Sequence, residues 1–486
     1  MPPSVSRRRF VSLAAQSAVL GAASLSAVSS APSTPAAPPR GIWRVQRNPR
    51  ALRAPLDVPP GETWRHYLGF PFQVGPHVAG LYVNRKNCDF QGTDFGGGND
   101  IILFDDSAKI DPARGLPISR LRLAPNPHDG GRPAILAPYP GSLGFVPFGA
   151  RLADGRPHPH AGTGFILINL SAWPVDGGGN FETYPDRIGR TWYRDHRRYH
   201  PSELIQIGYD GTRLAIISRQ PLEEPEILPG YHSSWTGLGC AIADGEDLLI
   251  GMQASRPGDP AARSGIARWR RTEGAWRAVE FTPITPADNS IEASLVRDLD
   301  GSLIYFARGR RHLGPPARLW RQARPGGEWE LRCDLPRMLP STPAVLGQAV
   351  DGTPYLAGNL WQPEYRLPAG LYADAGVSRL EPVGWRGERS TLCVWPLNEA
   401  RDGFEAPLIA RDPRTEFGLP PHGTLWAADH PVSNQVRLAD GQWHTLMSYR
   451  MLEWKENTHF IPPSPQTGCY LDEVVSFGPP RPLWNF

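Results

Sequence analysis

Short runs in which apolar and polar residues alternate recur along most of the chain, and many of them meet at an Asp-Gly pair. Five such hairpins run through residues 204–218, 239–253, 294–309, 344–359 and 434–450. Alternation with a period of two is typical of strands with one buried face, and Asp-Gly supplies the positive φ angles of a tight hairpin turn. The pattern therefore predicts antiparallel hairpins, and it predicts no amphipathic helix after the N-terminal segment.

The hairpins recur at a regular spacing. The turn aspartates Asp244, Asp300 and Asp351 are separated by 56 and 51 residues, and further strands with tryptophan follow the first two turns, in residues 266–280 and 318–336. A four-stranded unit repeated at this spacing is typical of β-propellers. We predict an all-β fold, a propeller of four-stranded antiparallel blades, with six blades expected and seven as the alternative.

Composition supports many turns and elaborated loops. The chain of 486 residues contains 51 Gly, 54 Pro and 16 Trp. Residues 111–142 and 172–202 are long and rich in Pro and Gly, and we interpret them as loops over one face of the propeller.

The N-terminus carries an export motif. Arg7, Arg8 and Phe10 precede an apolar run of small residues up to about Val28. This arrangement resembles a twin-arginine signal, and the run is too short for a membrane span. We expect a periplasmic or secreted protein without a membrane span. The predicted divisions are a signal peptide (1–30), a disordered connector (31–45) and the propeller (46–486).

The charge and the motifs of the chain argue against nucleic acid, metal ions and cofactors as partners. The net charge of +3 is too small to indicate nucleic acid as a partner. No short His/carboxylate spacing typical of zinc and no nucleotide fingerprint is present, so neither a metal nor a cofactor is expected. The cysteines have no C-x-x-C spacing, which argues against a zinc site; they are Cys88, Cys240, Cys333, Cys393 and Cys469.

One hairpin brings a carboxylate and an arginine together. With its turn at Asp300-Gly301, residue 292 should lie opposite residue 309, so Glu292 and Arg308 should share one end of adjacent strands. Blade strands converge on the propeller axis, where guanidinium groups would bind a substrate carboxylate bidentately. A carboxylic acid beside the leaving oxygen would act as general acid. A structural ion pair is the alternative interpretation.

Residues 81–107 carry Arg85 and then Asp94 before a strand, and Arg65 stands 20 residues before Arg85. Together with Glu292 and Arg308, this order resembles the sialidases (neuraminidases). The resemblance implies a sialidase-like propeller in which Asp94 is the acid/base and Glu292 activates the nucleophile. It also implies arginines that bind the carboxylate of an acidic sugar; these are Arg65, Arg85, Arg308 and Arg401, with Arg389 as the second choice for the last.

The chain departs from the sialidase pattern at the nucleophile. Sialidases place a tyrosine eight residues before a later Asp-Gly turn, and here that position is Val432. We expect Tyr449 to face Val432 across the hairpin, with His430 two residues away as the alternative for the vacated position. Glu292 would then activate Tyr449, our first choice as nucleophile, or a water molecule. The Asp-box turns of sialidases are also missing, with residues 184–192 as the nearest remnant.

Three functions follow. The first is a glycoside hydrolase acting on an acidic sugar or glycan, with Asp94, Glu292 and Tyr449 as catalytic residues. The second is a polysaccharide lyase that uses the histidines and tyrosines of residues 158–160, 191–203 and 231–235 to abstract the α-proton of a uronic acid. The third is a propeller that binds carbohydrate without catalysis.

Overall fold

The computed structural model divides the chain into Met1–Pro38 and Pro39–Phe486. It describes residues 41–486 with gaps at 49–50, 53–54, 59, 88–96, 140, 178–181, 186–190, 194–200, 224–226, 232, 260, 289, 310–317, 335–342, 361–388, 419–424 and 455–463. Within the described part no helix is long and apolar enough to cross a membrane.

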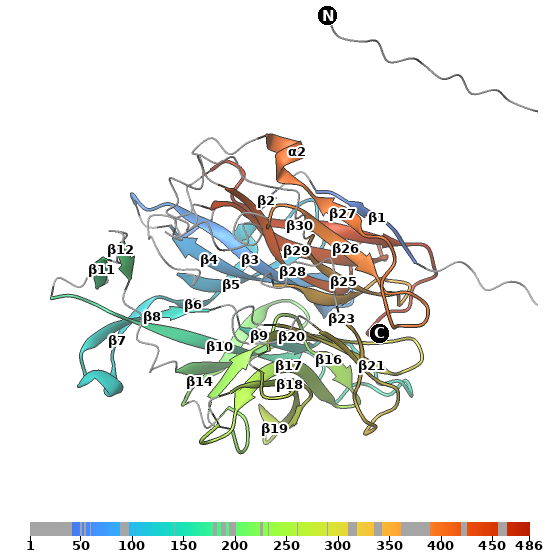
Figure 1. Cartoon of the computed structure of the whole chain (residues 1–486), viewed down its shortest axis with the longest axis horizontal. Coiled ribbons are helices and arrows are strands. Elements are labelled where there is room, and N and C mark those ends of the chain that lie inside the picture. The colour runs from blue at the N-terminus through green and yellow to red at the C-terminus, as the bar shows by residue number, and fades with distance from the viewer. Residues whose placement is uncertain are drawn as a thin grey trace, which may run out of the picture. The chain divides into compact units, whose positions relative to one another are not determined.

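Six antiparallel sheets form a six-bladed β-propeller (Figure 1). Blade 1 contains β3 (Trp64–Gly75), β4 (Val78–Asn87), β5 (Gly98–Phe104) and β6 (Gly115–Arg120). Blade 2 contains β9 (Ser142–Val146), β10 (Thr163–Pro174), β13 (Ser202–Tyr209) and β14 (Leu214–Leu222). Blade 3 contains β16 (Ile242–Asp244), β17 (Asp247–Ser255), β18 (Arg263–Thr272) and β19 (Ala275–Pro283), with β15 (Ser233–Thr236) also paired to β17.

The remaining three blades follow the same plan. Blade 4 contains β20 (Ile291–Arg297), β21 (Leu303–Arg308), β22 (Arg318–Gln322) and β23 (Glu330–Asp334). Blade 5 contains β24 (Val345–Gln348), β25 (Pro354–Asn359), β26 (Leu392–Pro396) and β27 (Leu408–Arg411). Blade 6 contains β28 (Leu425–Arg437), β29 (Trp443–Trp454), β30 (Gly468–Ser476) and β1 (Ile42–Gln46), with β2 (Ala51–Leu52) also paired to β30. The prediction of four-stranded blades is confirmed, with six as their number.

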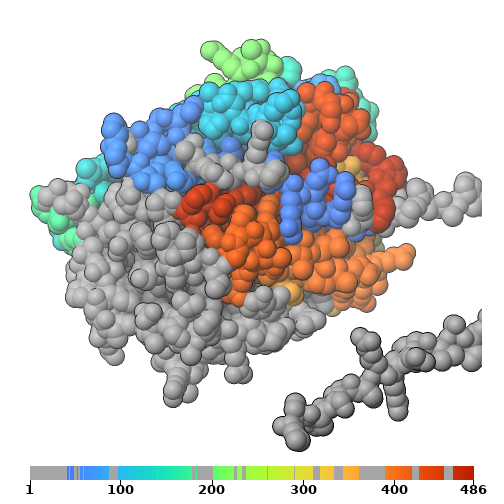
Figure 2. All heavy atoms as spheres, turned by 90° about the horizontal axis from the view of Figure 1, so that it is seen from above, coloured from blue at the N-terminus to red at the C-terminus, as the bar shows by residue number. Residues whose placement is uncertain are grey.

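The ring is closed by strands from both ends of the described chain. The N-terminal strand β1 pairs with β30, so it forms the outer strand of a blade whose other strands come last in the sequence. In Figure 2 the blue N-terminal segment lies against the orange and red segments of blades 5 and 6. β1 begins at Ile42, before residue 46, at which the sequence analysis starts the propeller.

The inner strands are β3, β9, β16, β20, β24 and β28. Each begins on one face of the propeller, called here the top face, and ends on the opposite, bottom face. The Asp-Gly turns after β16, β20, β24 and β28 therefore lie on the bottom face. The glycines of the five predicted turns all have positive φ, from 65° at Gly245 to 97° at Gly211, as the tight turns require.

Side-chain amides on the inner strands connect neighbouring blades. Gln73 of blade 1 donates to the backbone oxygen of Arg437 in blade 6 (3.1 Å), and Gln435 of blade 6 donates to Ala349 in blade 5 (2.8 Å). Gln348 of blade 5 donates in turn to Arg297 in blade 4 (2.6 Å). The amides donate to backbone carbonyls of the neighbouring blade, which keeps buried polar groups paired near the axis.

The hydrophobic core lies between the faces of adjacent blades. One cluster joins Leu81 of blade 1 to Val436 and Leu471 of blade 6. Between blades 2 and 3, Phe165 stacks on Trp269 with ring centroids 4.2 Å apart. Each blade therefore buries both of its faces against its neighbours, as expected of a propeller.

One of the two predicted loop regions is largely strand. Residues 111–142 contain β6, β7 (Arg122–Pro125) and β8 (Pro133–Pro138), and the last two extend the blade 2 sheet along β10. Pro133 lies at the first position of β8, where its missing N–H is tolerated. In the other region, β11 (Thr183–Pro185) pairs with β12 (Thr191–Tyr193). The described helices are α2 (Pro413–Phe417) and two short 3-10 turns at Pro112–Arg114 and Pro127–Asp129.

Candidate active site

Three inner strands are interrupted by a β-bulge close to the top face. The bulges fall in β3 between His66 and Gly69, in β20 between Ile291 and Ser294, and in β28 between Asp429 and Val432. Glu292 and His430, which lie within two of these bulges, both have a φ of 52°. Non-glycine residues rarely adopt this conformation, and bulges are frequent beside active sites because they redirect side chains. The top face is therefore where the inner strands depart from regular pairing.

Glu292 and Arg308 meet on the top face, as the hairpin pattern predicted. Glu292 Oε2 lies 2.8 Å from Arg308 Nε, and the side chains are 15% and 12% exposed. The predicted register, with residue 292 opposite residue 309, was wrong, because Ile291 pairs with Arg308. The pairing is already shifted by one residue at the turn, where Arg297 pairs with Leu303, and the bulge between Ile291 and Ser294 shifts it by one more.

Asp429 is a buried carboxylate surrounded by two arginines and a histidine. Its side chain is fully buried, with Arg389 Nη1 at 2.8 Å from Oδ2 and His430 Nδ1 at 3.0 Å from Oδ1. Arg450 donates to both carboxylate oxygens, with Nη2 at 3.0 Å from Oδ2. Burial alone would raise the pKa of Asp429, but Arg450, His430 and Arg389 hold it well below its ordinary value.

His430 contacts Asp429, and its pKa is also influenced by Glu292. Burial lowers the pKa of its imidazole, and the charge of Arg450 lowers it further, whereas Asp429 and Glu292 act in the opposite direction. Glu292 is therefore close enough to His430 to influence its charge. The pair Glu292–Arg308 and the cluster around Asp429 therefore lie near each other on the top face.

Arg65 lies near the start of β3, also on the top face. Its Nη1 donates to the backbone oxygen of Trp64 (2.9 Å), and its Nε is buried without a hydrogen-bond partner among the described residues. Two residues further on, the Tyr67 hydroxyl accepts a hydrogen bond from Arg450, whose guanidinium carbon lies 4.5 Å from the Tyr67 ring centroid. Blade 1 thus contacts the Asp429 cluster directly.

Arg85 is held inside blade 1. It is 2% exposed, and its Nη1 lies 2.7 Å from Asp57 Oδ1, while its guanidinium carbon lies 5.0 Å from the Trp64 ring centroid. Asp57 and Asp100 both also pair with Arg120. The predicted substrate-binding group therefore already has carboxylate partners in the same blade.

The structure places Arg401 on the bottom face. Its Nε lies 2.7 Å from Asp298 Oδ2, in the turn that follows β20. The prediction that Arg401 joins Arg308 is therefore wrong, because Arg401 lies in the turn between β26 and β27, at the other end of the blade. Arg389, which precedes β26, is on the top face and contacts Asp429.

Tyr449 does not reach Glu292. Val432 pairs with Ser448, so the predicted opposition of Tyr449 and Val432 is wrong by one residue, because the turn pairs Arg437 with Trp443 and is therefore centred on Asp440 rather than between Asp440 and Gly441. The Tyr449 hydroxyl donates to Asp472 (2.8 Å) and accepts from Arg411 (2.6 Å). Tyr449 is fully buried in the core between blades 5 and 6.

Several predicted groups cannot be placed in this site. Asp94 lies outside the described residues, as does most of residues 194–203, which the lyase hypothesis used. His158 and His160 lie on the bottom face, where His158 Nε2 is 3.2 Å from the backbone oxygen of Gly245. Within the described part of the chain, no group of three or more His, Cys, Asp or Glu residues could hold a metal ion.

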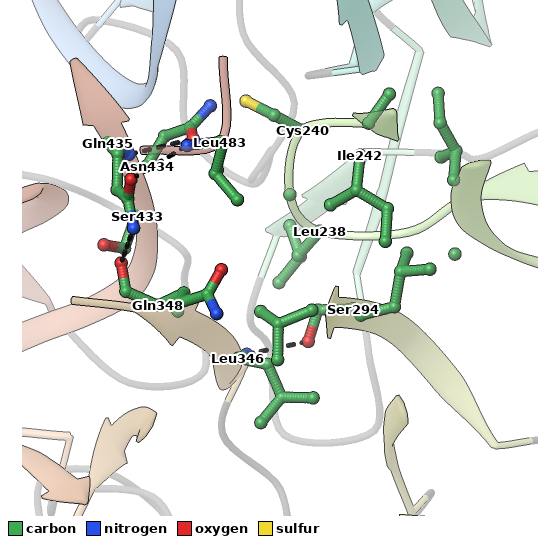
Figure 3. Close-up of a pocket in the computed structure, with 17 residues that line it drawn as sticks. Leu238, Cys240, Ile242, Ser294, Leu346, Gln348, Ser433, Asn434, Gln435 and Leu483 are labelled. Carbon is green, nitrogen blue, oxygen red and sulfur yellow. Dashed lines mark hydrogen bonds between the residues drawn. The ribbon is translucent and has the colours of Figure 1, made fainter. Parts of the chain in front are cut away.

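Two cavities lie on the axis away from this cluster. One of about 30 Å³ is lined by residues such as Ser294, Gln348 and Gln435 (Figure 3). A second, of about 270 Å³, opens on the bottom face beneath Leu483 and Trp484. Neither of these two cavities is lined by Glu292, Arg308 or His430.

The sequence analysis missed Asp429 and Arg450. Asp429 lies in β28 and Arg450 lies in β29, and the other buried residues of these strands are largely apolar. A charged residue in each of two consecutive predicted strands is a signal for a buried ion pair, since isolated charges are rarely buried. Register alone would not have paired them, because of the bulge in β28.

Comparison with models of protein families finds no match, and comparison with curated proteins finds none. Similar solved structures include a protein of unknown function from Dyadobacter fermentans, with a TM-score of 0.47 and 14% identity over 88% of this chain and 99% of that one. A Hadza microbial sialidase has a TM-score of 0.45 and 11% identity over 85% and 66% of the two chains. The α-L-arabinanase of Penicillium chrysogenum has a TM-score of 0.42 and 9% identity over 89% and 98%.

Proposed function

We propose that this chain is an exported glycoside hydrolase that binds an acidic sugar or glycan on the top face. The observation that supports this most is the cluster of Glu292, Arg308, Asp429 and Arg389 at the bulged starts of the inner strands. Asp94, predicted as the acid/base, belongs to the same hypothesis.

The charges of the cluster favour an anionic ligand. Arg308, Arg389 and Arg450 bring guanidinium groups to the top face beside the carboxylates of Glu292 and Asp429, and Arg65 lies on the same face. Guanidinium groups bind carboxylates bidentately, so a substrate carboxylate is the ligand that they would favour. Glu292 is partly exposed, so it can contact a ligand, whereas Asp429 is sealed beneath His430.

A binding and turnover assay with two arginine variants tests the proposal. Purified protein is given aryl glycosides of sialic, glucuronic and galacturonic acid and their neutral counterparts. We expect wild type to hydrolyse at least one acidic glycoside, and Arg308→Ala to weaken its binding roughly 10- to 100-fold, because one charged hydrogen-bonding group is lost. Arg401→Ala is the matched control, since it removes an ion-paired arginine from the bottom face.

Three outcomes would overturn the proposal in different ways. Equal binding by Arg308→Ala and wild type would place the ligand elsewhere. Binding of an acidic glycan without cleavage would leave a carbohydrate-binding propeller. An unsaturated product, detected by its ultraviolet absorbance, would show the lyase reaction instead.

A further inference from the structure

His430 occupies an unusual position in the top-face cluster. It has a φ of 52° within the bulge of β28, a conformation that a histidine adopts rarely and that a bulge can stabilise. The side chain is 8% exposed, so it is mostly buried but still meets solvent. Strain of this kind is frequent in residues that a fold must aim at a ligand.

The contact with Asp429 favours one protonation pattern of the imidazole. Nδ1 lies 3.0 Å from Asp429 Oδ1, and the Asp429 carboxylate carries a negative charge. Electrostatic attraction therefore favours a single imidazole proton on Nδ1, which leaves the Nε2 lone pair available. A carboxylate beside Nδ1 favours this tautomer in histidines that act as bases.

The charged groups around His430 come from several strands. Asp429 precedes it in β28, Arg450 lies in β29, Arg389 precedes β26, and Glu292 lies in the bulge of β20 with its partner Arg308. Arg450 and Arg389 are both bound to Asp429, so their charges are partly balanced there. Together with burial, this environment lowers the pKa of His430 and favours the neutral imidazole at neutral pH.

We propose that His430 is the general base of the top-face site and that water, not a tyrosine, attacks the substrate. The inference rests on the proposed hydrolase function and assigns its nucleophile. Tyr449 cannot take this role in the observed arrangement, because its hydroxyl is buried between Arg411 and Asp472.

The step balances without any further reactant. On an aryl glycoside, Nε2 of His430 takes a proton from water as the water oxygen forms a bond to the anomeric carbon. The bond from that carbon to the aryl oxygen breaks, and the phenolate leaves with the electron pair. His430 then returns its proton to solvent. Direct attack by water inverts the configuration at the anomeric carbon.

Three measurements test the proposal. We expect His430→Gln to lower kcat by about 10²- to 10⁴-fold with little change in ligand affinity. Wild-type kcat should fall as the pH drops through the His430 pKa, below the ordinary histidine value of 6.5, and His430→Gln should lose this dependence. The first product seen by NMR should have inverted configuration. His77→Gln, a solvent-exposed histidine on the bottom face, is the matched control.

Failure of the hydrolase function and failure of the proposed role of His430 give different results. If the wild type cleaves no acidic glycoside, both the hydrolase function and the role of His430 are overturned. If it cleaves one with retention, or if His430→Gln keeps the wild-type kcat and pH profile, only the role of His430 is overturned. NMR of protein with ¹⁵N-labelled histidine gives a readout without substrate: a proton on Nε2 instead of Nδ1 in the neutral form would also overturn it.

Discussion

At the scale of single residues, Asp429 determines how the top-face cluster is held together. It compensates the charges of Arg389 and Arg450 and contacts His430, so its partners come from the segment before β26, from β29 and from its own strand. Removing one member of such a group leaves charges buried without compensation, which costs far more than a surface ion pair contributes.

We therefore expect Asp429→Asn to lower the free energy of unfolding by about 3–5 kcal/mol, measured by urea denaturation at neutral pH. Asp154→Asn, which breaks the exposed pair with Arg156, is the control and should change little. If Asp429→Asn lowers the free energy of unfolding by no more than Asp154→Asn does, this would contradict the conclusion that Asp429 compensates the arginines around it.

The same substitution changes the acid dependence of stability. Because the pKa of Asp429 is lowered in the folded state, its contribution is complete above the ordinary value of 3.8 and is lost as the pH falls toward the lower folded pKa. Asp429→Asn should weaken the loss of stability in this acid range.

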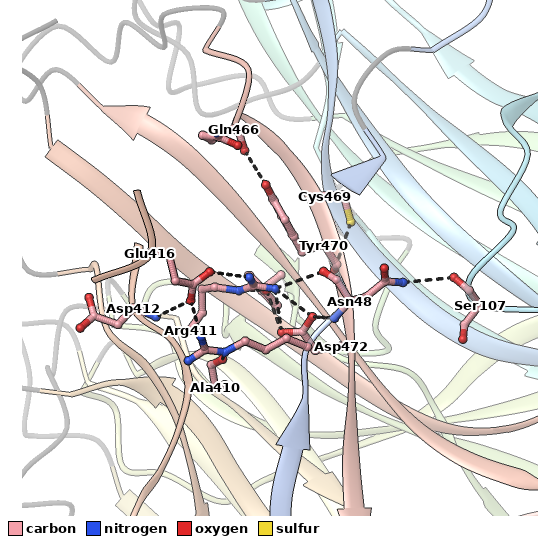
Figure 4. Close-up of polar contacts among 12 residues, drawn as sticks. Asn48, Ser107, Ala410, Arg411, Asp412, Glu416, Gln466, Cys469, Tyr470 and Asp472 are labelled. Carbon is pink, nitrogen blue, oxygen red and sulfur yellow. Dashed lines mark hydrogen bonds and ion pairs between the residues drawn. The ribbon is translucent and has the colours of Figure 1, made fainter. Parts of the chain in front are cut away.

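At the scale of elements, the closure between blades 5 and 6 depends on a buried polar network (Figure 4). Arg411, at the end of β27, contacts Asp472 of β30 at 3.1 Å and Glu416 of α2 at 2.7 Å. Asn48, just after β1, donates its backbone N–H to Asp472 (2.9 Å). The network therefore joins the N-terminal segment to two later blades. Tyr449 is part of it.

Tyr449→Phe separates this structural role from the catalytic role predicted from the sequence. Losing the hydroxyl removes hydrogen bonds to Arg411 and Asp472, and we expect the free energy of unfolding to fall by about 1–3 kcal/mol. Turnover of the folded variant should match wild type. A folded Tyr449→Phe protein without turnover would return Tyr449 to the chemistry and would contradict water as the nucleophile.

At the scale of the whole molecule, segments from both ends of the described chain pair with the blades and hold the ring together. β1 completes blade 6, and the C-terminal segment crosses the bottom face, where Arg151 of blade 2 donates its backbone N–H to Asn485 (2.8 Å). Leu483 donates its N–H to Gln435 of blade 6 (3.2 Å). A ring closed by residues from both ends cannot form until almost all of the chain is available.

This late closure suits an export route that carries folded proteins, as proposed for the twin-arginine segment. Replacing Arg7 and Arg8 together by Lys should trap the precursor in the cytoplasm, measured by cell fractionation and immunoblotting. Arg9→Lys, outside the arginine pair, is the control and should be exported. Unchanged export of the double variant would refute the signal assignment.

The sequence by itself determined the class of fold and part of the site. Asp-Gly turns and period-two alternation are local properties, so they predicted the hairpins, the blade repeat and the meeting of Glu292 with Arg308. Only the tertiary structure decided the rest. The exact pairing at the turn, Arg437 with Trp443, and the bulge beyond Val432 leave no mark in the local pattern, so the partners of Tyr449 and His430 could not be counted from the Asp-Gly pair. Arg389, rather than Arg401, joined the cluster, because the face on which a loop residue lies depends on the packing of the whole blade ring.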